Sequence, residues 1–473
     1  MEVPFIQLLR SPYACYFFDV NTNSIVMVSE EAYSALKEIT KNGSPPLSVS
    51  EGCSAELERL KAQGYLSSKK VKEIEHPLTQ DLDYILSRMV GKVTLQLTQS
   101  CNLRCTYCIY SETTNDKQRK HSGKRMSWET AKAGIDFLAE HSMDIDRVNV
   151  GFYGGEPLLE FDLLKIATLY AEERFEGRDL TINLTSNATL LNDEILSFFA
   201  EHDIHLTISL DGPKSIHDRS RCFAKGGGTF DTVMANLRYA VERYPNYAHN
   251  ISINMVMDPR NSYDCLNDFI VEYDVFKTAI PHASPLDMEY SGQQEGISEQ
   301  FLIENTYDHF LAYLKYFRRL KSAEVPYLAQ RDIDSAIRRY EKHMKHISAL
   351  PDKTMHGGPC IPGQARLFIN ADGDFYPCER VSELSDSMRI GNLKDGFNLE
   401  QARSILNIGQ LTAEQCTNCW AINHCGTCAK KADGGSCLSG EIKQKSCQYM
   451  RRNVENEIRA EIMRREIKGG MLK

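Results

Sequence analysis

The sequence lacks any apolar run close to the roughly 20 residues that a helix needs to cross a bilayer. It has no excess of positive charge, since its net charge is −9, and this argues against non-specific binding to nucleic acid or anionic membranes. Internal repeats and low-complexity tracts are absent as well. The apolar N-terminus is interrupted by Arg10 and Asp19, which excludes the core of a signal peptide. We therefore expect a cytoplasmic protein of 473 residues, with about two or three domains, that binds neither membranes nor nucleic acid.

Fifteen cysteines are present, and in the cytoplasm they should be thiols or metal ligands because disulfides are rare there. Four isolated ones are expected to be small buried apolar residues: Cys15, Cys53, Cys222 and Cys265. The others form two groups, one in "CNLRCTYC" and one of eight between Cys360 and Cys447. This uneven distribution predicts metal binding.

The first group places Cys101, Cys105 and Cys108 within eight positions, with no fourth cysteine or histidine nearby. A structural zinc site needs four protein ligands and fits poorly. A four-iron cluster held by three thiolates would leave one iron free to bind a small molecule. The motif therefore favours an iron–sulfur cluster with an open position.

From about residue 92 the sequence alternates strands and helices. Apolar strands are expected at 92–98, 147–154, 180–186, 205–212 and 250–257, with amphipathic helices such as 127–141 and 230–244 between them. This pattern indicates a parallel α/β sheet, open or barrel-like. Ligands bind at the carboxyl ends of such strands, and the three-cysteine motif directly follows the first strand. Residues 297–345 are expected to be helical and charged, with no chemistry assigned to them.

Residues 1–78 are predicted to form a small separate module. Strand-like segments at 13–20 and 24–29 flank the turn "NTN", and a helix follows through Ala32 and Leu36. A second helix from residue 55 should end at Gly64, in the C′ position. Residues 79–91 are predicted to be a linker.

The second cysteine group surrounds a predicted hairpin, "ARLFINADGDFYP", that turns at Asp372–Gly373. Further along, "CTNCWAINHCGTC" separates two CxxC pairs by only five residues, whereas zinc ribbons usually separate them by roughly 15–20. A zinc ribbon is therefore disfavoured.

The spacing C-x3-C-x2-C after a first strand resembles the radical S-adenosylmethionine superfamily. The resemblance implies a partial (β/α)6 barrel with a helical bridge over 92–345, and S-adenosylmethionine bound on the open iron. It implies that Gly154, Gly155 and Glu156 of "FYGGEP" hold the methionyl amino group, because glycines permit close approach and an ammonium needs acceptors. It also implies cofactor contacts for the following residues: Tyr107 on the adenine side, and Ser209 and Arg221 at the ribose and carboxylate.

The order C-x12-G-x4-C, C-x2-C-x5-C-x2-C and a later cysteine resembles the SPASM domain, here over 346–450, before a C-terminal helix at 451–473. The resemblance implies two auxiliary clusters, hence three [4Fe-4S] clusters in all. The distal one would be held by Cys416, Cys419, Cys425 and Cys447, and the proximal one by Cys360, Cys378 and Cys428. The last spacing, x2 rather than x3, and the extra Cys437 depart from the common pattern. The proximal cluster would have an open iron unless Cys437 fills it.

The N-terminal module resembles the winged-helix-like leader-recognition domain of ribosomal-peptide maturases, which binds its peptide as an added strand, here beside "NSIVMVS". A generic structural cap is the alternative. Taken with the other motifs, the resemblance extends over nearly the whole chain and is to the Cys-rich-peptide maturases, including freyrasin-type thioether-forming enzymes.

This resemblance implies that a 5′-deoxyadenosyl radical removes hydrogen from a core-peptide residue, whose carbon then couples to a cysteine thiol. Implied partners are a Cys-containing precursor bound through its leader and a low-potential electron donor such as ferredoxin or flavodoxin. Glu379 would be an acid–base residue, or else a solvated or capping glutamate. Other products stay open: a Cα sactionine, a C–C crosslink or formylglycine. An electron-carrier protein would not explain "GGEP", and a sulfatase-maturating enzyme would not need a leader-binding domain.

Overall fold

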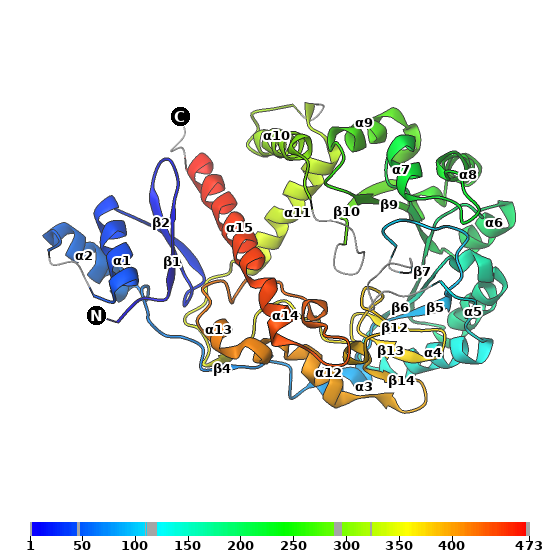
Figure 1. Ribbon diagram of the computed structural model, residues 1–473, viewed down its shortest axis with the longest axis horizontal. Coiled ribbons are helices and arrows are strands. Elements are labelled where there is room, and N and C mark those ends of the chain that lie inside the picture. The colour runs from blue at the N-terminus through cyan, green and yellow to red at the C-terminus, as the bar shows by residue number, and fades with distance from the viewer. Residues whose placement is uncertain are drawn as a thin grey trace.

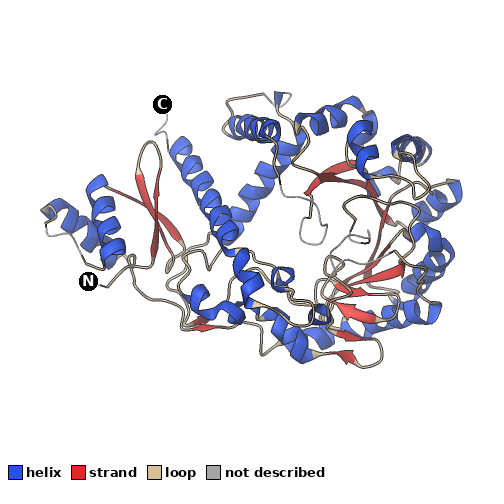
Figure 2. Cartoon of the chain, in the orientation of Figure 1, coloured by secondary structure: helices blue, strands red, loops and turns tan. Residues whose placement is uncertain are grey.

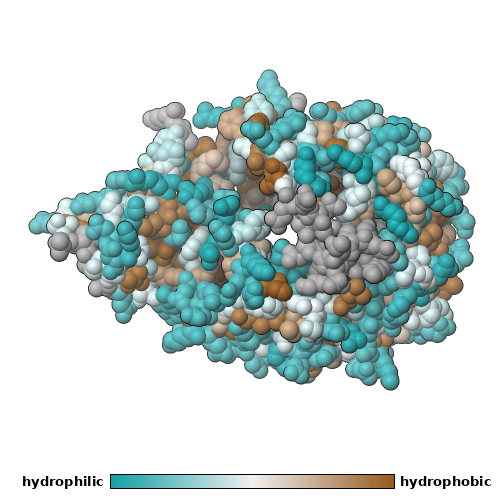
Figure 3. Space-filling model, viewed as in Figure 1, coloured by the Kyte–Doolittle hydropathy of each residue, from teal (hydrophilic) through white to brown (hydrophobic). Residues whose placement is uncertain are grey.

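The computed structural model describes residues 2–44, 48–108, 110, 121–287, 296–321 and 324–469. Figure 1 shows an N-terminal sheet with two helices at one end and a ring of strands and helices at the other, with α15 (Cys447–Lys468) between them. Among the described residues, no helix is long and apolar enough to cross a bilayer. Figure 3 shows a mainly hydrophilic face with apolar residues in small patches.

The ring is built on a curved sheet with helices on its outer side (Figures 1 and 2). Six neighbouring parallel strands follow chain order: β5 (Lys92–Thr98), β6 (Arg147–Gly154), β7 (Asp179–Ser186), β8 (His205–Ser209), β9 (Ile251–Met257) and β10 (Ile280–Pro285). The connecting helices include α4 (Trp128–His141), α5 (Phe161–Arg174), α6 (Asp193–Glu201), α7 (Lys214–Ser220), α8 (Phe230–Arg243) and α9 (Asp264–Glu272). The predicted partial barrel is confirmed.

Local sequence explains these elements. β5 alternates: Val93, Leu95 and Leu97 form one fully buried apolar face, and the opposite face carries polar side chains that are also buried, namely Thr94, Gln96 and Thr98. Helix α4 begins where Ser127 accepts a hydrogen bond from the Thr130 amide, a serine N-cap. Gly134 lets α4 approach β5, since a Cβ there would lie 2.8 Å from Leu95 Cδ2.

The C-terminal segment continues the same sheet. β12 (Leu367–Ile369) pairs in parallel with β5, and β13 (Asp374–Tyr376), β14 (Gly391–Asn392) and β15 (Gly396–Phe397) add antiparallel strands. The predicted hairpin turns at Gly373, whose φ is 89°. Its pairing with the barrel was not anticipated from the sequence. The remaining helices include α10 (Glu299–Tyr316), α11 (Tyr327–His343), α12 (Leu399–Leu406), α13 (Ala413–Thr417) and α14 (Gly440–Lys445).

The N-terminal sheet has the order β1 (Ile6–Arg10), β2 (Cys15–Asp19), β3 (Ser24–Val28). Phe17 on one face packs with α1 (Glu30–Asn42) and α2 (Glu51–Ala62), which ends before Gly64 as predicted. On the other face, Tyr16 and Phe18 belong to the principal core of the molecule. The sheet is therefore packed on both sides.

The segment predicted as a linker, residues 79–91, contains a helix, α3 (Leu82–Arg88), which buries Leu82, Ile85 and Leu86. Just before it, at the end of the predicted N-terminal module, β4 (Glu73–Ile74) pairs with β11 (Lys353–Thr354). The apolar side chains of α3 attach the segment to the core rather than leaving it extended in solvent.

Candidate iron–sulfur and cofactor site

The three-cysteine loop leaves the carboxyl end of β5, with Cys105 buried and Cys101 and Cys108 half-buried. Burial raises the pKa of the Cys101 and Cys105 thiols to about 12, so their ionisation needs a strong positive partner such as iron. The Leu103 amide donates to Cys101 Sγ and the Tyr110 amide donates to Cys108 Sγ, each at a donor–acceptor distance of 3.4 Å.

These sulfurs have the surroundings that an anionic cluster requires. The Arg221 guanidinium lies 4.0 Å from Cys105 Sγ, and Asn187 Nδ2 lies 3.9 Å from Cys101 Sγ. Such donors stabilise thiolate ligands. Within the described residues, no three or more Cys, His, Asp or Glu side chains are grouped as they would be around a single metal ion. The thiols of Cys101 and Cys105, with donors beside both, fit a thiolate-bound iron–sulfur cluster.

The glycines of "GGEP" pack against the chain that leads into this loop. Gly154 has φ 144°, and a Cβ on it would lie 2.2 Å from the Thr98 carbonyl oxygen. A Cβ on Gly155 would lie 2.1 Å from the Ser100 carbonyl oxygen. Both glycines are therefore required for the close approach of β6 to the residues just before Cys101.

Glu156 is buried and already has several donors. Its Oε1 accepts from Ser186 Oγ (2.7 Å) and the Leu158 amide (3.0 Å), and its Oε2 accepts from the Asn187 amide (2.8 Å). Burial raises the pKa of this carboxyl, while these donors act in the opposite direction. The structure gives Glu156 a local architectural role; binding of the methionyl amino group by "GGE" stays a prediction.

Asp211, in "ISLDGP", joins two of the predicted cofactor residues. Its Oδ2 accepts from Arg221 Nε at 2.9 Å and from the Tyr107 hydroxyl, and the Arg221 guanidinium lies over the Tyr107 ring at 5.4 Å. Burial raises the pKa of Tyr107, and Asp211 raises it further. Ser209 is buried at the end of β8, two residues before Asp211. Asp211 was not among the residues predicted from the sequence, although its place after a barrel strand was the available signal.

The predicted distal cysteines lie together. Cys416 is in α13, and Cys447 is the first residue of α15. Burial raises the pKa of Cys419, and the charges of Cys425 and Cys416 raise it further. Burial also raises the pKa of Cys447, and Cys416 and Cys425 add to that shift. Buried Lys443, which the sequence analysis also missed, donates to Cys416 Sγ at 3.6 Å.

Of the predicted proximal cysteines, Cys378 follows the end of β13 and Cys428 lies near enough to act on it. Burial raises the pKa of Cys378 to about 11, with contributions from Glu379 and Cys428. Cys360 and Cys428 are exposed, as is Cys437, which lies in a turn closed by its carbonyl and the Gly434 amide.

Glu379 is held by cations. Its Oε1 accepts from Arg366 Nη1 at 2.9 Å, and its charge acts on Lys92 at the start of β5. Cys378 and Glu379 therefore lie toward the amino end of β5, away from the first cysteine loop.

Comparison with known proteins settles the central part of the chain. Residues 95–271 match the family described as the Radical SAM superfamily. The chain contains a radical SAM domain. This radical SAM domain holds the three-cysteine loop, "GGEP", Ser209 and Arg221, so the predicted radical SAM domain is confirmed for residues 95–271.

Relatives extend this likeness beyond the radical SAM domain. The chain is 25% identical over 303 residues to an uncharacterised protein of Methanocaldococcus jannaschii, covering 64% of this chain and 88% of the relative. It is 25% identical over 342 residues to the cysteine-type anaerobic sulfatase-maturating enzyme of Clostridium novyi, covering 68% and 83%. The fold resembles the solved structure of histidine-tagged anSMEcpe with bound AdoMet, with a TM-score of 0.54, 19% identity, and coverage of 78% and 96%.

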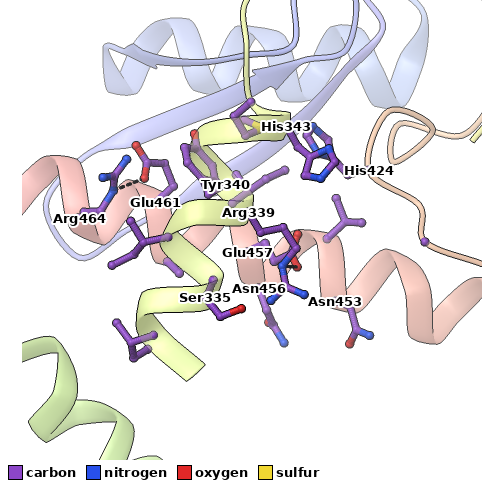
Figure 4. Close-up of a pocket in the computed structure, with 18 of the residues that line it drawn as sticks. Ser335, Arg339, Tyr340, His343, His424, Asn453, Asn456, Glu457, Glu461 and Arg464 are labelled. Carbon is purple, nitrogen blue, oxygen red and sulfur yellow. Dashed lines mark hydrogen bonds and ion pairs between the residues drawn. The ribbon is translucent and has the colours of Figure 1, made fainter. Parts of the chain in front are cut away.

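A cavity of about 740 Å³ lies between α11 and α15, in the region where the sequence analysis assigned no chemistry. Figure 4 shows Tyr340 on one side and Asn453 and Glu457 on the other, with His424 at one end. Cys425 also lines it, so the cavity reaches the loop of the distal cysteines.

Proposed function

We propose that the protein is a radical S-adenosylmethionine enzyme that forms a thioether between a cysteine sulfur and a carbon of another residue in a ribosomally made precursor peptide. The observation that carries this proposal is the three-cysteine loop at the carboxyl end of β5 within the radical SAM domain. The grouped C-terminal cysteines support additional redox centres.

In this proposal three [4Fe-4S] clusters and S-adenosylmethionine are the cofactors. Cys101, Cys105 and Cys108 would hold the first cluster, and the two C-terminal cysteine groups the auxiliary clusters. Gly154, Gly155, Glu156, Ser209, Arg221 and Tyr107 would surround S-adenosylmethionine. When bound, these groups would supply the radical that removes a hydrogen atom and the acceptor for the remaining electron.

The proposed cofactors account for every atom and electron that leaves the peptide. One C–H and one S–H bond are lost and one C–S bond forms, so a hydrogen atom, a proton and an electron leave the peptide. The Glu379 carboxylate, held by Arg366, would take the proton from the thiol.

The peptide substrate is supported by the names of similar proteins. The relatives include sulfatase-maturating enzymes, and one structure of the same fold, with a TM-score of 0.53, contains AdoMet and a peptide called Cp18Cys. The N-terminal sheet supports a leader site because β3 is an edge strand. Arg465 Nη1 already donates to the Ile25 carbonyl on this edge at 3.0 Å, so an added strand would pair from Met27 onward.

Formylglycine formation is the second candidate, and the sulfatase-maturating relatives favour it. A Cα thioether or a C–C crosslink would use the same residues. The products differ chemically, since only a thioether consumes a thiol without losing its sulfur.

The test is an anaerobic reaction of the reconstituted enzyme with S-adenosylmethionine, a reductant and a short cysteine-rich peptide encoded next to its gene. We expect 5′-deoxyadenosine and a peptide that loses two hydrogens per crosslink in mass spectrometry. A peptide whose acceptor cysteine is replaced by serine is the control and should stay unmodified. A product with an aldehyde in place of a thiol would establish the second candidate instead.

A further inference from the structure

Lys443 is a buried lysine in α14, with 2% of its surface exposed. Its Nζ donates to Thr412 Oγ1 at 2.6 Å and to Cys416 Sγ at 3.6 Å. Throughout the described residues, no carboxylate lies within ion-pair distance of this ammonium. Lysine is almost never fully buried unless it is paired with a negative group.

The energetics of burial require a counter-charge. An ammonium removed from water without a partner is strongly disfavoured, and a hydroxyl and a neutral thiol do not neutralise it. Among the described residues, the groups able to become negative beside Lys443 are two of the predicted distal cysteines, Cys416 and Cys447. Cys416 is in contact with it, and the positive charge of Lys443 acts on Cys447.

We propose that Lys443 is the buried counter-cation of the distal iron–sulfur cluster and raises the reduction potential of that cluster. This inference rests on the proposed function, because it needs the cluster to be present. Four thiolates give the cluster a net negative charge, and reduction adds another electron. A fixed positive charge beside Cys416 therefore stabilises the reduced cluster more than the oxidised one.

Lys443 would thus be a positioning and tuning residue that does not contact the peptide. A purely structural lysine, retained for its hydrogen bond to Thr412, is the competing explanation. The two explanations predict different stabilities for the protein without its cluster. A counter-cation destabilises the empty site and stabilises the loaded one, whereas a structural lysine contributes equally to both.

The first measurement is a redox titration of the full chain, followed by electron paramagnetic resonance, for wild type, Lys443→Met and Lys443→Arg. We expect one of the three cluster potentials to move to a lower value in Lys443→Met, with the other two unchanged as internal controls. Lys443→Arg keeps the charge and should leave all three potentials near those of wild type. Full iron content with three unchanged potentials in Lys443→Met would overturn the inference.

The second measurement compares Tm values with and without iron. Lys443→Met should raise Tm of the iron-free chain, where the ammonium is uncompensated, and lower Tm of the loaded chain. Loss of distal iron in Lys443→Met but not in Lys443→Arg also supports a counter-cation. Loss in both variants, or a Tm change of the same sign in both states, contradicts it. A wild-type protein that binds no auxiliary iron would refute the proposed function itself, which separates the two failures.

Discussion

The Nε2 atom of His424 lies 2.7 Å from Oδ1 of Asn23. This contact joins the turn between β2 and β3 to the residue just before Cys425. The side-chain amide of Asn23 also donates to the carbonyls of His343 and Lys345, each at 3.0 Å. One asparagine therefore ties the N-terminal sheet to both the end of α11 and the loop of the distal cysteines.

Replacing Asn23 by glycine should loosen this attachment. Glycine tolerates the φ of 55° at this position, so the backbone is kept while three hydrogen bonds are lost, at a cost of about 2 kcal/mol. We expect a lower Tm and faster hydrogen exchange at residues 20–24 and 423–425. Asn42→Gly, at the exposed end of α1, is the matched control and should leave exchange in both segments unchanged. Equal exchange in Asn23→Gly and wild type would show that the contact is dispensable.

The edge of β3 offers a direct test of leader binding. Deleting the whole N-terminal sheet is a poor test, because Tyr16 and Phe18 would leave a cavity in the principal core. The Ile25 carbonyl faces outward to Arg465, and alternation along the strand directs the Met27 amide outward as well. Met27→Pro removes this amide and should weaken binding of a fluorescent leader peptide about tenfold, equivalent to about 1.4 kcal/mol. Met27→Thr retains the amide and serves as the control; equal affinities for the two variants would exclude strand addition at this edge.

Gly155→Ala should disrupt the first cysteine loop. A Cβ at this position would lie 2.1 Å from the Ser100 carbonyl oxygen, so Ser100 and the adjoining Cys101 must move. We expect loss of about one third of the iron and of S-adenosylmethionine cleavage, with auxiliary clusters retained. Gly123→Ala is the control, since nothing lies within 4 Å of a Cβ there. Full cleavage activity in Gly155→Ala would show that the loop does not depend on this packing.

Asp308 on α10 predicts a pH dependence of stability. Burial raises its pKa to about 6, and Asp264, Glu304 and Asp268 add to the shift while His309 opposes it. The folded state therefore holds a proton that the unfolded state releases near pH 4, and this carboxyl destabilises the fold progressively as pH rises from about 4 to 6.

Asp308→Asn should remove this penalty. The amide oxygen can still accept the hydrogen bond that Asn267 Nδ2 donates at 2.9 Å. We expect urea unfolding to show a variant that is more stable by on the order of 2 kcal/mol at pH 7.5, with this advantage reduced to roughly a third at pH 4.5. A difference that does not change with pH would exclude the raised pKa.

The extra cysteine near the proximal group gives a further prediction. Cys437→Ala should leave iron content and thioether formation largely intact, whereas Cys378→Ala should abolish product. The reason is that, in the proposed function, Cys360, Cys378 and Cys428 would be the ligands and the open iron would bind a substrate thiolate. Iron analysis and peptide mass spectrometry check both variants. A structure with Cys437 Sγ within about 2.5 Å of a proximal iron would contradict this assignment.

Much of the barrel could be predicted because apolar residues alternate with polar ones along its strands and helices of clear period lie between them, and because the cysteine spacing is local in the sequence. The pairing of β12 with β5 could not, since it joins segments about 270 residues apart and leaves no local pattern. Asp211 and Lys443 escaped notice because charged residues are normally exposed. Only the folded chain shows that Asp211 is buried in an ion pair with Arg221 and that Lys443 is buried in contact with Cys416.

The pairing of β12 with β5 also fixes the distance between two cysteine sites. The first cysteine loop leaves the carboxyl end of β5, whereas β13 runs back and delivers Cys378 near Lys92 at the amino end. Seven residues of extended chain therefore separate the two sites by about 20 Å. Because hydrogen bonds fix the register, this spacing does not adapt to the substrate; lengthening β5 and β12 by two residues each would widen it by about 7 Å. A peptide loop that is processed at both sites must therefore span this fixed separation.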